Sequence, residues 1–117
     1  MTVYVESNFV LELALQQEQA EAARLLLERA IRGDITLALP SIALTEPFST
    51  LTQRGRNLNR EIGLLRNRAK DLARSVSYQR EFRDLAAVQA HLESVSVRET
   101  ARLSETVATV LDAARII

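Results

Sequence analysis

The predicted fold depends on two stretches of the 117-residue chain, VYVESNFV at residues 3–10 and LALPSIALTE at residues 37–46. Each stretch begins with the apolar residues of a short buried strand and continues into the first turn of a helix. The first strand ends at Glu6, and the second is followed by a Pro-Ser break and, one helical turn later, by Glu46. The two stretches therefore predict an α/β chain in which an acidic side chain follows each of two strands.

The rest of the chain is predicted to alternate helices with strands. The second strand is apolar at nearly every position, which is typical of a parallel sheet covered by helices on both faces. Gly33 is expected to end the second helix and Pro47 to kink the third. Strands are predicted at residues 2–5, 35–39 and 93–97, and helices at residues 9–14, 18–32, 41–51, 56–72, 78–91 and from residue 99 onward.

The last predicted helix has no stop signal before Ile117. Two interpretations stay open: a domain whose C-terminal part is missing, which we favour, and a helix that docks at its C-terminal end. A truncated domain would leave an apolar helix face uncovered, and such a face drives self-association. We therefore expect a homo-oligomer that buries this face, which is formed by Leu103, Val107, Val110 and Leu111.

Length and composition narrow the class of protein. A chain of 117 residues with 47% hydrophobic residues predicts one folded domain that spans residues 1–117. The absence of cysteine excludes disulfides and thiolate sites, and the single histidine, His91, argues against zinc bound by paired imidazoles. The sequence contains neither a membrane span nor a signal peptide pattern, so we expect a cytoplasmic protein with no membrane partner.

Positive charge is concentrated in one segment. The net charge is zero, but residues 54–74 contain seven basic and two acidic residues, against eight and thirteen in the rest of the chain. The simplest interpretation is a solvated helix face, and the functional one is a surface that binds RNA phosphates. The candidate nucleic-acid-binding residues are Arg54, Arg56, Arg60, Arg66, Arg68 and Lys70.

Glu6 and Glu46 are the residues best suited to chemistry. If the two strands are parallel neighbours, both carboxylates lie near the carboxyl edge of the sheet, where ligand sites form in α/β proteins. Two converging carboxylates suit Mg²⁺ or Mn²⁺, which would polarise a phosphodiester and activate a water molecule. Each acid also has a simpler interpretation, since Glu6 would cap the following helix and Glu46 would be a solvated helix residue.

The ordered pair of stretches resembles the opening half of PIN domains, a family of metal-dependent ribonucleases. In that family a strand ends in an acid followed by a Ser/Thr-Asn pair, and a second strand leads through Pro-Ser to a glutamate on the next helix. The resemblance implies a three-layer α/β fold, with a central parallel sheet flanked by helices. It also implies that Glu6 and Glu46 hold Mg²⁺ or Mn²⁺, and that Glu6, Glu46 and Asn8 form the catalytic site.

Three features depart from that family. Glu6 stands where aspartate is usual, and Pro47 directly follows Glu46. A third aspartate, which the family carries at the start of a later helix, has no clear counterpart, because Asp112 lies inside a continuous helical pattern. With two candidate ligands, we expect weak metal binding and poor catalysis.

Three functional hypotheses follow. The leading one is a PIN-type endoribonuclease that hydrolyses RNA with Mg²⁺ or Mn²⁺, and the alternative is a catalytically inactive relative that binds nucleic acid or protein. A simple helical interaction protein would be favoured if residues 2–5 and 35–39 are not strands. RNA is the expected partner, and the resemblance adds an antitoxin protein as a candidate partner.

Overall fold

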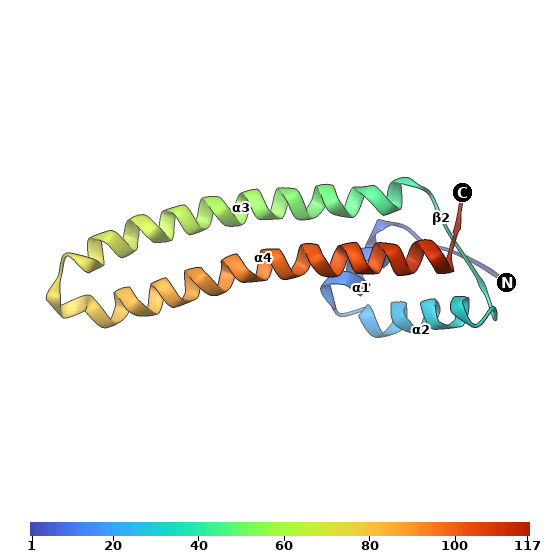
Figure 1. Cartoon of the computed structure of the whole chain (residues 1–117), viewed down its shortest axis with the longest axis horizontal. Helices are drawn as coiled ribbons and strands as arrows, with labels where there is room; N and C mark the ends of the chain where they lie inside the picture. Colours follow the sequence, from blue (N-terminus) through green and yellow to red (C-terminus); the bar gives the residue numbers. More distant parts are fainter. The chain divides into compact units, whose positions relative to one another are not determined.

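The computed structural model describes all residues, 1–117. Two long helices, α3 and α4, make up more than half of the chain, and the strands are short (Figure 1). In chain order the elements are β1 (Thr2–Tyr4), α1 (Ser7–Leu15), α2 (Ala20–Ile31), β2 (Thr36–Leu39), α3 (Ile42–Ala73), the 3-10 turn η1 (Val76–Tyr78), α4 (Gln79–Ala113) and β3 (Arg115–Ile116). No helix is both long and apolar enough to cross a bilayer.

The prediction of a three-layer PIN-like fold with a central sheet is wrong. Helices contain 78% of the residues, and the sheet has three short parallel strands. The strand predicted at residues 93–97 lies inside α4. The two helices predicted at residues 41–51 and 56–72 are parts of the single helix α3, which begins at Ile42. Pro47 is fully buried near the start of α3 and does not end it. The fold is therefore mostly helical, with a small parallel sheet.

The chain divides into two compact units. Unit 1 comprises Met1–Leu51 and Glu99–Ile117, and unit 2 comprises Thr52–Arg98. Unit 1 contains five basic and ten acidic residues, whereas unit 2 contains ten basic and five acidic residues. The charge segregation seen along the sequence therefore follows the division into units, with net charges of −5 and +5.

The sheet of unit 1 has the strand order β1-β2-β3, with both pairs parallel. Tyr4 is in register with Ala38, and Ala38 is in register with Arg115 on the other side. The Val5 N–H donates to the Ala38 carbonyl at 2.9 Å and extends the first pairing beyond β1. The prediction that residues 2–5 and 35–39 form neighbouring parallel strands is thus confirmed.

Unit 1 has its core around the central strand β2. Leu37 and Leu39 of β2 are fully buried, together with Val10 of α1 and Leu103 and Val110 of α4. This burial explains why β2 is apolar at almost every position, since a strand between helices meets apolar side chains on both faces. It also corrects the expectation of an uncovered helix face, because Leu103 and Val110 pack internally and only Leu111 is half exposed.

The chain end is a strand, whereas the sequence predicted a continuing helix. Helix α4 ends at Ala113, and β3 follows after one residue. The Ile117 N–H donates to the Leu39 carbonyl at 3.0 Å, so pairing with β2 holds this segment extended. Two residues are too few to show a strand pattern in the sequence, and this pairing alone decides their conformation.

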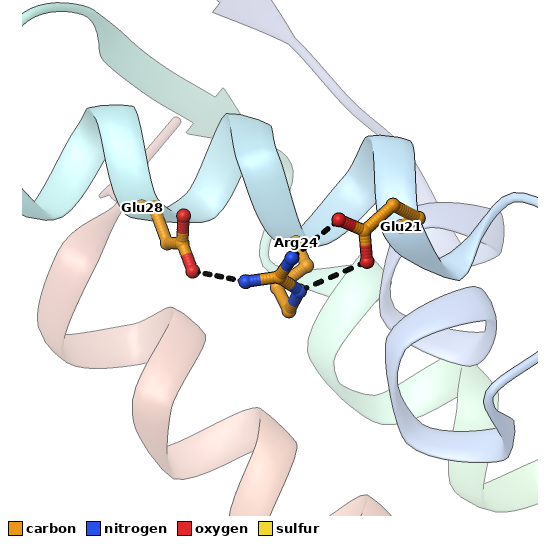
Figure 2. Close-up of polar contacts among 3 residues, drawn as sticks. All are labelled: Glu21, Arg24 and Glu28. Atoms are coloured by element: carbon orange, nitrogen blue, oxygen red, sulfur yellow. Dashed lines mark hydrogen bonds and ion pairs between the residues drawn. The ribbon is translucent and has the colours of Figure 1, made fainter.

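Helix α2 ends as predicted and carries an ion-pair cluster on its exposed face. Gly33 has a φ of 83°, and its N–H donates to the Ala30 carbonyl, which is the usual glycine-terminated helix end. Figure 2 shows the Arg24 guanidinium bonded to the carboxylates of Glu21 and Glu28 on neighbouring turns. Hydrogen bonding to Arg24, and its charge, lower the pKa of Glu21, while bonding to Glu21 and the charges of both acids raise the pKa of Arg24.

Unit 2 is a helical hairpin formed by parts of α3 and α4. Its less exposed residues recur every three or four positions, which is the spacing of a coiled-coil seam. A Cβ built on Gly55 would lie 3.8 Å from the Ser96 Oγ, and the Arg66 Nη2 lies 3.4 Å from the Glu93 Oε1, so the two helices run side by side. The seam residues are Gly55, Leu58, Ile62, Leu65, Ala69 and Leu72 of α3 and Phe82, Leu85, Gln89, Leu92 and Ser96 of α4.

Candidate functional site

The carboxyl ends of β1 and β2 bring the two predicted acids to one hollow in unit 1. Glu6 lies two residues after the end of β1, and Glu46 lies just over one turn into α3, which begins after Pro40 and Ser41. We call this the acidic hollow; its volume is about 370 Å³. It is lined by Glu6, Ser7, Asn8, Pro40, Ile42, Ala43 and Glu46. All three residues assigned to a catalytic site from the sequence therefore line the same hollow.

One contact inside the acidic hollow was not anticipated. The Ser7 Oγ donates a hydrogen bond of 2.8 Å to the Glu46 Oε2, and this bond joins the start of α1 to α3 across 39 residues of sequence. The Ser/Thr-Asn pair in the sequence was a reason to expect a role for Ser7. Only the fold brings Glu46 within hydrogen-bonding distance of the Ser7 hydroxyl. The bond orients one Glu46 oxygen toward Ser7 and so fixes the direction in which the carboxylate faces the hollow.

Glu6 does not act as a side-chain cap for α1. It occupies the N-cap position, but its carboxylate makes no capping hydrogen bond, and only its backbone carbonyl accepts from the Phe9 N–H, at 3.0 Å. The simpler interpretation of Glu6 as a helix cap is therefore wrong for the side chain. Its carboxylate is exposed to solvent and lines the acidic hollow.

The acidic hollow provides only part of a metal site. Glu6, Glu46 and the side-chain oxygens of Ser7 and Asn8 are hard oxygen donors, the type that Mg²⁺ and Mn²⁺ prefer. No group of three acidic, histidine or cysteine side chains in the structure is arranged to hold an ion. Asp112 does not contribute, because it lines a different hollow with Ala30, Ile31, Thr109 and Ala113. An ion at Glu6 and Glu46 would therefore keep most of its water ligands.

The six candidate RNA-binding residues do not share one face of α3. Successive residues of an α-helix are rotated by about 100°, so positions can be compared with the buried seam residues Ile62 and Ala69. Arg54 and Arg68 lie on one flank of the seam, and Arg66 lies on the other flank, where it pairs with Glu93 at 3.4 Å. The spacing of Leu58, Ile62, Leu65 and Leu72 in the sequence was a signal that could have separated these three residues from the others.

Three of the remaining basic residues lie on the side of α3 away from the seam, and Arg74 directly follows the end of the helix. We call Arg56, Arg60, Lys70 and Arg74 the basic stripe. All four are exposed, and none makes a salt bridge or side-chain hydrogen bond. Gly63 lies on the same face, and a Cβ there would meet no atom within 4 Å, which confirms that this face is uncovered. Arg56 and Lys70, the outermost stripe residues within α3, are 14 positions apart, or about 21 Å at the rise of an α-helix.

Comparison with known proteins adds no assignment. No family model, no curated protein and no solved structure matches the chain.

Proposed function

We propose that this chain is an RNA-binding protein that contacts RNA phosphates through the basic stripe. The observation that carries the proposal is a set of four exposed cations that make no salt bridge, in a unit whose net charge is +5. Cations already neutralised by carboxylates would gain little from phosphate, whereas free ones release condensed counterions from the nucleic acid when they bind. We further propose a cytoplasmic location, since a chain without cysteine fits a reducing compartment.

The number of contacts sets the expected salt dependence. Four phosphate contacts to a single strand predict a slope of about −3 in log K against log salt, at about −0.7 per contact. The test is a titration of a labelled, unstructured single-stranded RNA at several salt concentrations. Binding that is absent, or that does not weaken as salt rises, would refute the proposal. An equal affinity for DNA of the same sequence would make the partner single-stranded nucleic acid in general.

A matched pair of variants separates the basic stripe from general electrostatics. The double variant Arg56→Gln/Arg60→Gln removes two stripe charges, and Arg54→Gln/Arg68→Gln removes two charges from the flank of the same helix. All four side chains are exposed and glutamine is a good helix former, so neither variant should unfold α3. We expect the stripe variant to lose affinity and to reduce the slope by about 1.4, while the flank variant changes the slope little. Equal effects would rule out the stripe as a specific contact surface.

The second candidate function is metal-dependent hydrolysis of RNA at the acidic hollow, the activity that the resemblance to PIN domains implies. The convergence of Glu6, Ser7, Asn8 and Glu46 on one hollow supports it. Glu6 and Glu46 would hold Mg²⁺ or Mn²⁺, and the ion would supply an activated water. With two carboxylates we expect cleavage to be poor, and RNA binding at the basic stripe to survive Glu6→Ala and Glu46→Ala. The assay is cleavage of labelled RNA with Mn²⁺; strong cleavage abolished by Glu46→Ala would establish this function.

A further inference from the structure

A second hollow in unit 1 lies beside the acidic hollow and differs from it in character. We call it the apolar pocket; its volume is about 460 Å³, within the range of small-molecule sites. It lies at the carboxyl ends of all three strands, the usual place for ligands in parallel α/β sheets. It is lined by Tyr4, Val5, Glu6, Phe9, Ala38, Pro40 and Ile117.

The walls of the apolar pocket suit a flat apolar group. Tyr4 is paired in the sheet through its backbone, yet the residue is 73% exposed, and Ile117 is 59% exposed. The buried Phe9 and Ala38 contribute apolar surface deeper in the pocket. Exposed aromatic side chains serve as stacking platforms for unpaired bases. The lining therefore offers an aromatic ring and aliphatic surface to a planar heterocycle.

Glu6 supplies the polar group that would select among bases. Its carboxylate makes no side-chain hydrogen bond and lines both the apolar pocket and the acidic hollow. An ionised carboxylate only accepts hydrogen bonds, so it favours a base edge that carries two donors. Guanine has such an edge, with its N1–H and its 2-amino group, whereas adenine carries a ring acceptor beside its amino group.

We propose that the apolar pocket binds an unpaired guanine base, stacked on Tyr4 and hydrogen-bonded to Glu6. The inference rests on the proposed function, since it names the base that an RNA bound by this chain would place in unit 1. A free guanine nucleotide has the same stacking surface and the same hydrogen-bond donors. The experiment therefore distinguishes a free nucleotide from a guanine within RNA.

The chain offers a direct optical test. It contains no tryptophan and two tyrosines, so Tyr78→Phe leaves Tyr4 as the only tyrosine fluorophore. In this background we expect guanosine monophosphate, and a short single-stranded RNA with one guanine among uridines, to quench Tyr4 fluorescence saturably. The same RNA with adenine in place of guanine should bind at least about fivefold more weakly, because a good bidentate contact discriminates by at least about 1 kcal/mol.

Variants assign the two contacts. Glu6→Gln replaces one acceptor oxygen by a donor and should remove the preference for guanine, while stacking on Tyr4 persists. Tyr4→Leu, made in the chain with Tyr78 intact and followed by anisotropy of labelled RNA, should weaken guanine binding, whereas Tyr4→Phe should retain it. Both side chains are exposed, and circular dichroism checks that each variant is folded.

The outcomes separate this inference from the proposed function. RNA that binds with the expected salt slope but leaves Tyr4 unquenched would overturn the guanine pocket and leave RNA binding at the basic stripe intact. Guanosine monophosphate that quenches Tyr4, in a chain that binds no RNA, would overturn the proposed function and make the free nucleotide the ligand. Equal quenching by guanine and adenine nucleotides would overturn the role of Glu6.

Discussion

Replacing each of the three glycines by alanine should change stability in a direction that the structure fixes. Gly63 lies inside α3, where an added methyl group would have no atom within 4 Å, and at Gly55 the nearest atom would be the Ser96 Oγ at 3.8 Å. Alanine is favoured over glycine in a helix interior by about 0.8–1.0 kcal/mol, and neither methyl group meets a clash. Each substitution should therefore stabilise the hairpin of unit 2 by about 1 kcal/mol. The two sites are eight residues apart, or about 12 Å, so their effects should add.

Gly33→Ala is the matched control with the opposite sign. Its position has open space, but its φ of 83° is one that alanine adopts only with strain, so we expect destabilisation by about 1–2 kcal/mol. Urea unfolding followed by circular dichroism measures all three, and amide hydrogen exchange of Ile62 and Ala69 reports unit 2 alone. If Gly33→Ala left the free energy of unfolding unchanged, or if Gly63→Ala lowered it, the backbone conformation described at that position would be wrong.

Three further predictions concern the core, the ion-pair cluster and the acidic hollow. Leu103→Ala should destabilise unit 1 by about 2–5 kcal/mol in urea unfolding because Leu103 is fully buried, whereas Leu64→Ala, at an exposed site, should change stability by less than about 0.5 kcal/mol. Arg24→Met should raise the pKa of Glu21 toward its ordinary value in a carboxyl NMR titration. The pKa of Glu21 is lower in the folded state than in the unfolded state, so the ion pair stabilises the fold at higher pH, and this stabilisation is lost as the pH falls through the folded-state pKa. The variant should not show this pH-dependent loss of stability. Ser7→Ala removes one oxygen donor of the acidic hollow and the hydrogen bond that positions Glu46, so it should weaken Mn²⁺ binding measured by electron paramagnetic resonance; unchanged or stronger binding would show that Ser7 neither binds the ion nor positions Glu46 for it.

Much of unit 1 was predictable from local sequence. The apolar run of residues 35–39 marked a buried strand, and Gly33 marked the end of α2, because few other residues adopt its backbone conformation. The order of strands, helices and acids also predicted that Glu6 and Glu46 meet, since the carboxyl ends of neighbouring parallel strands lie at one sheet edge. The assignment of these residues to catalysis stays a prediction.

Tertiary packing decided the rest. The valines at 95 and 97 fit a strand as well as a helix, and the segment is helical because Leu92 and Ser96, four residues apart, face the seam with α3 while Val97 is 72% exposed. The last residues continued a helical pattern in the sequence, yet hydrogen bonds to Leu39 hold them as β3. Short-range periodicity determines which residues prefer to be buried, whereas partners distant in sequence determine which backbone conformation buries them.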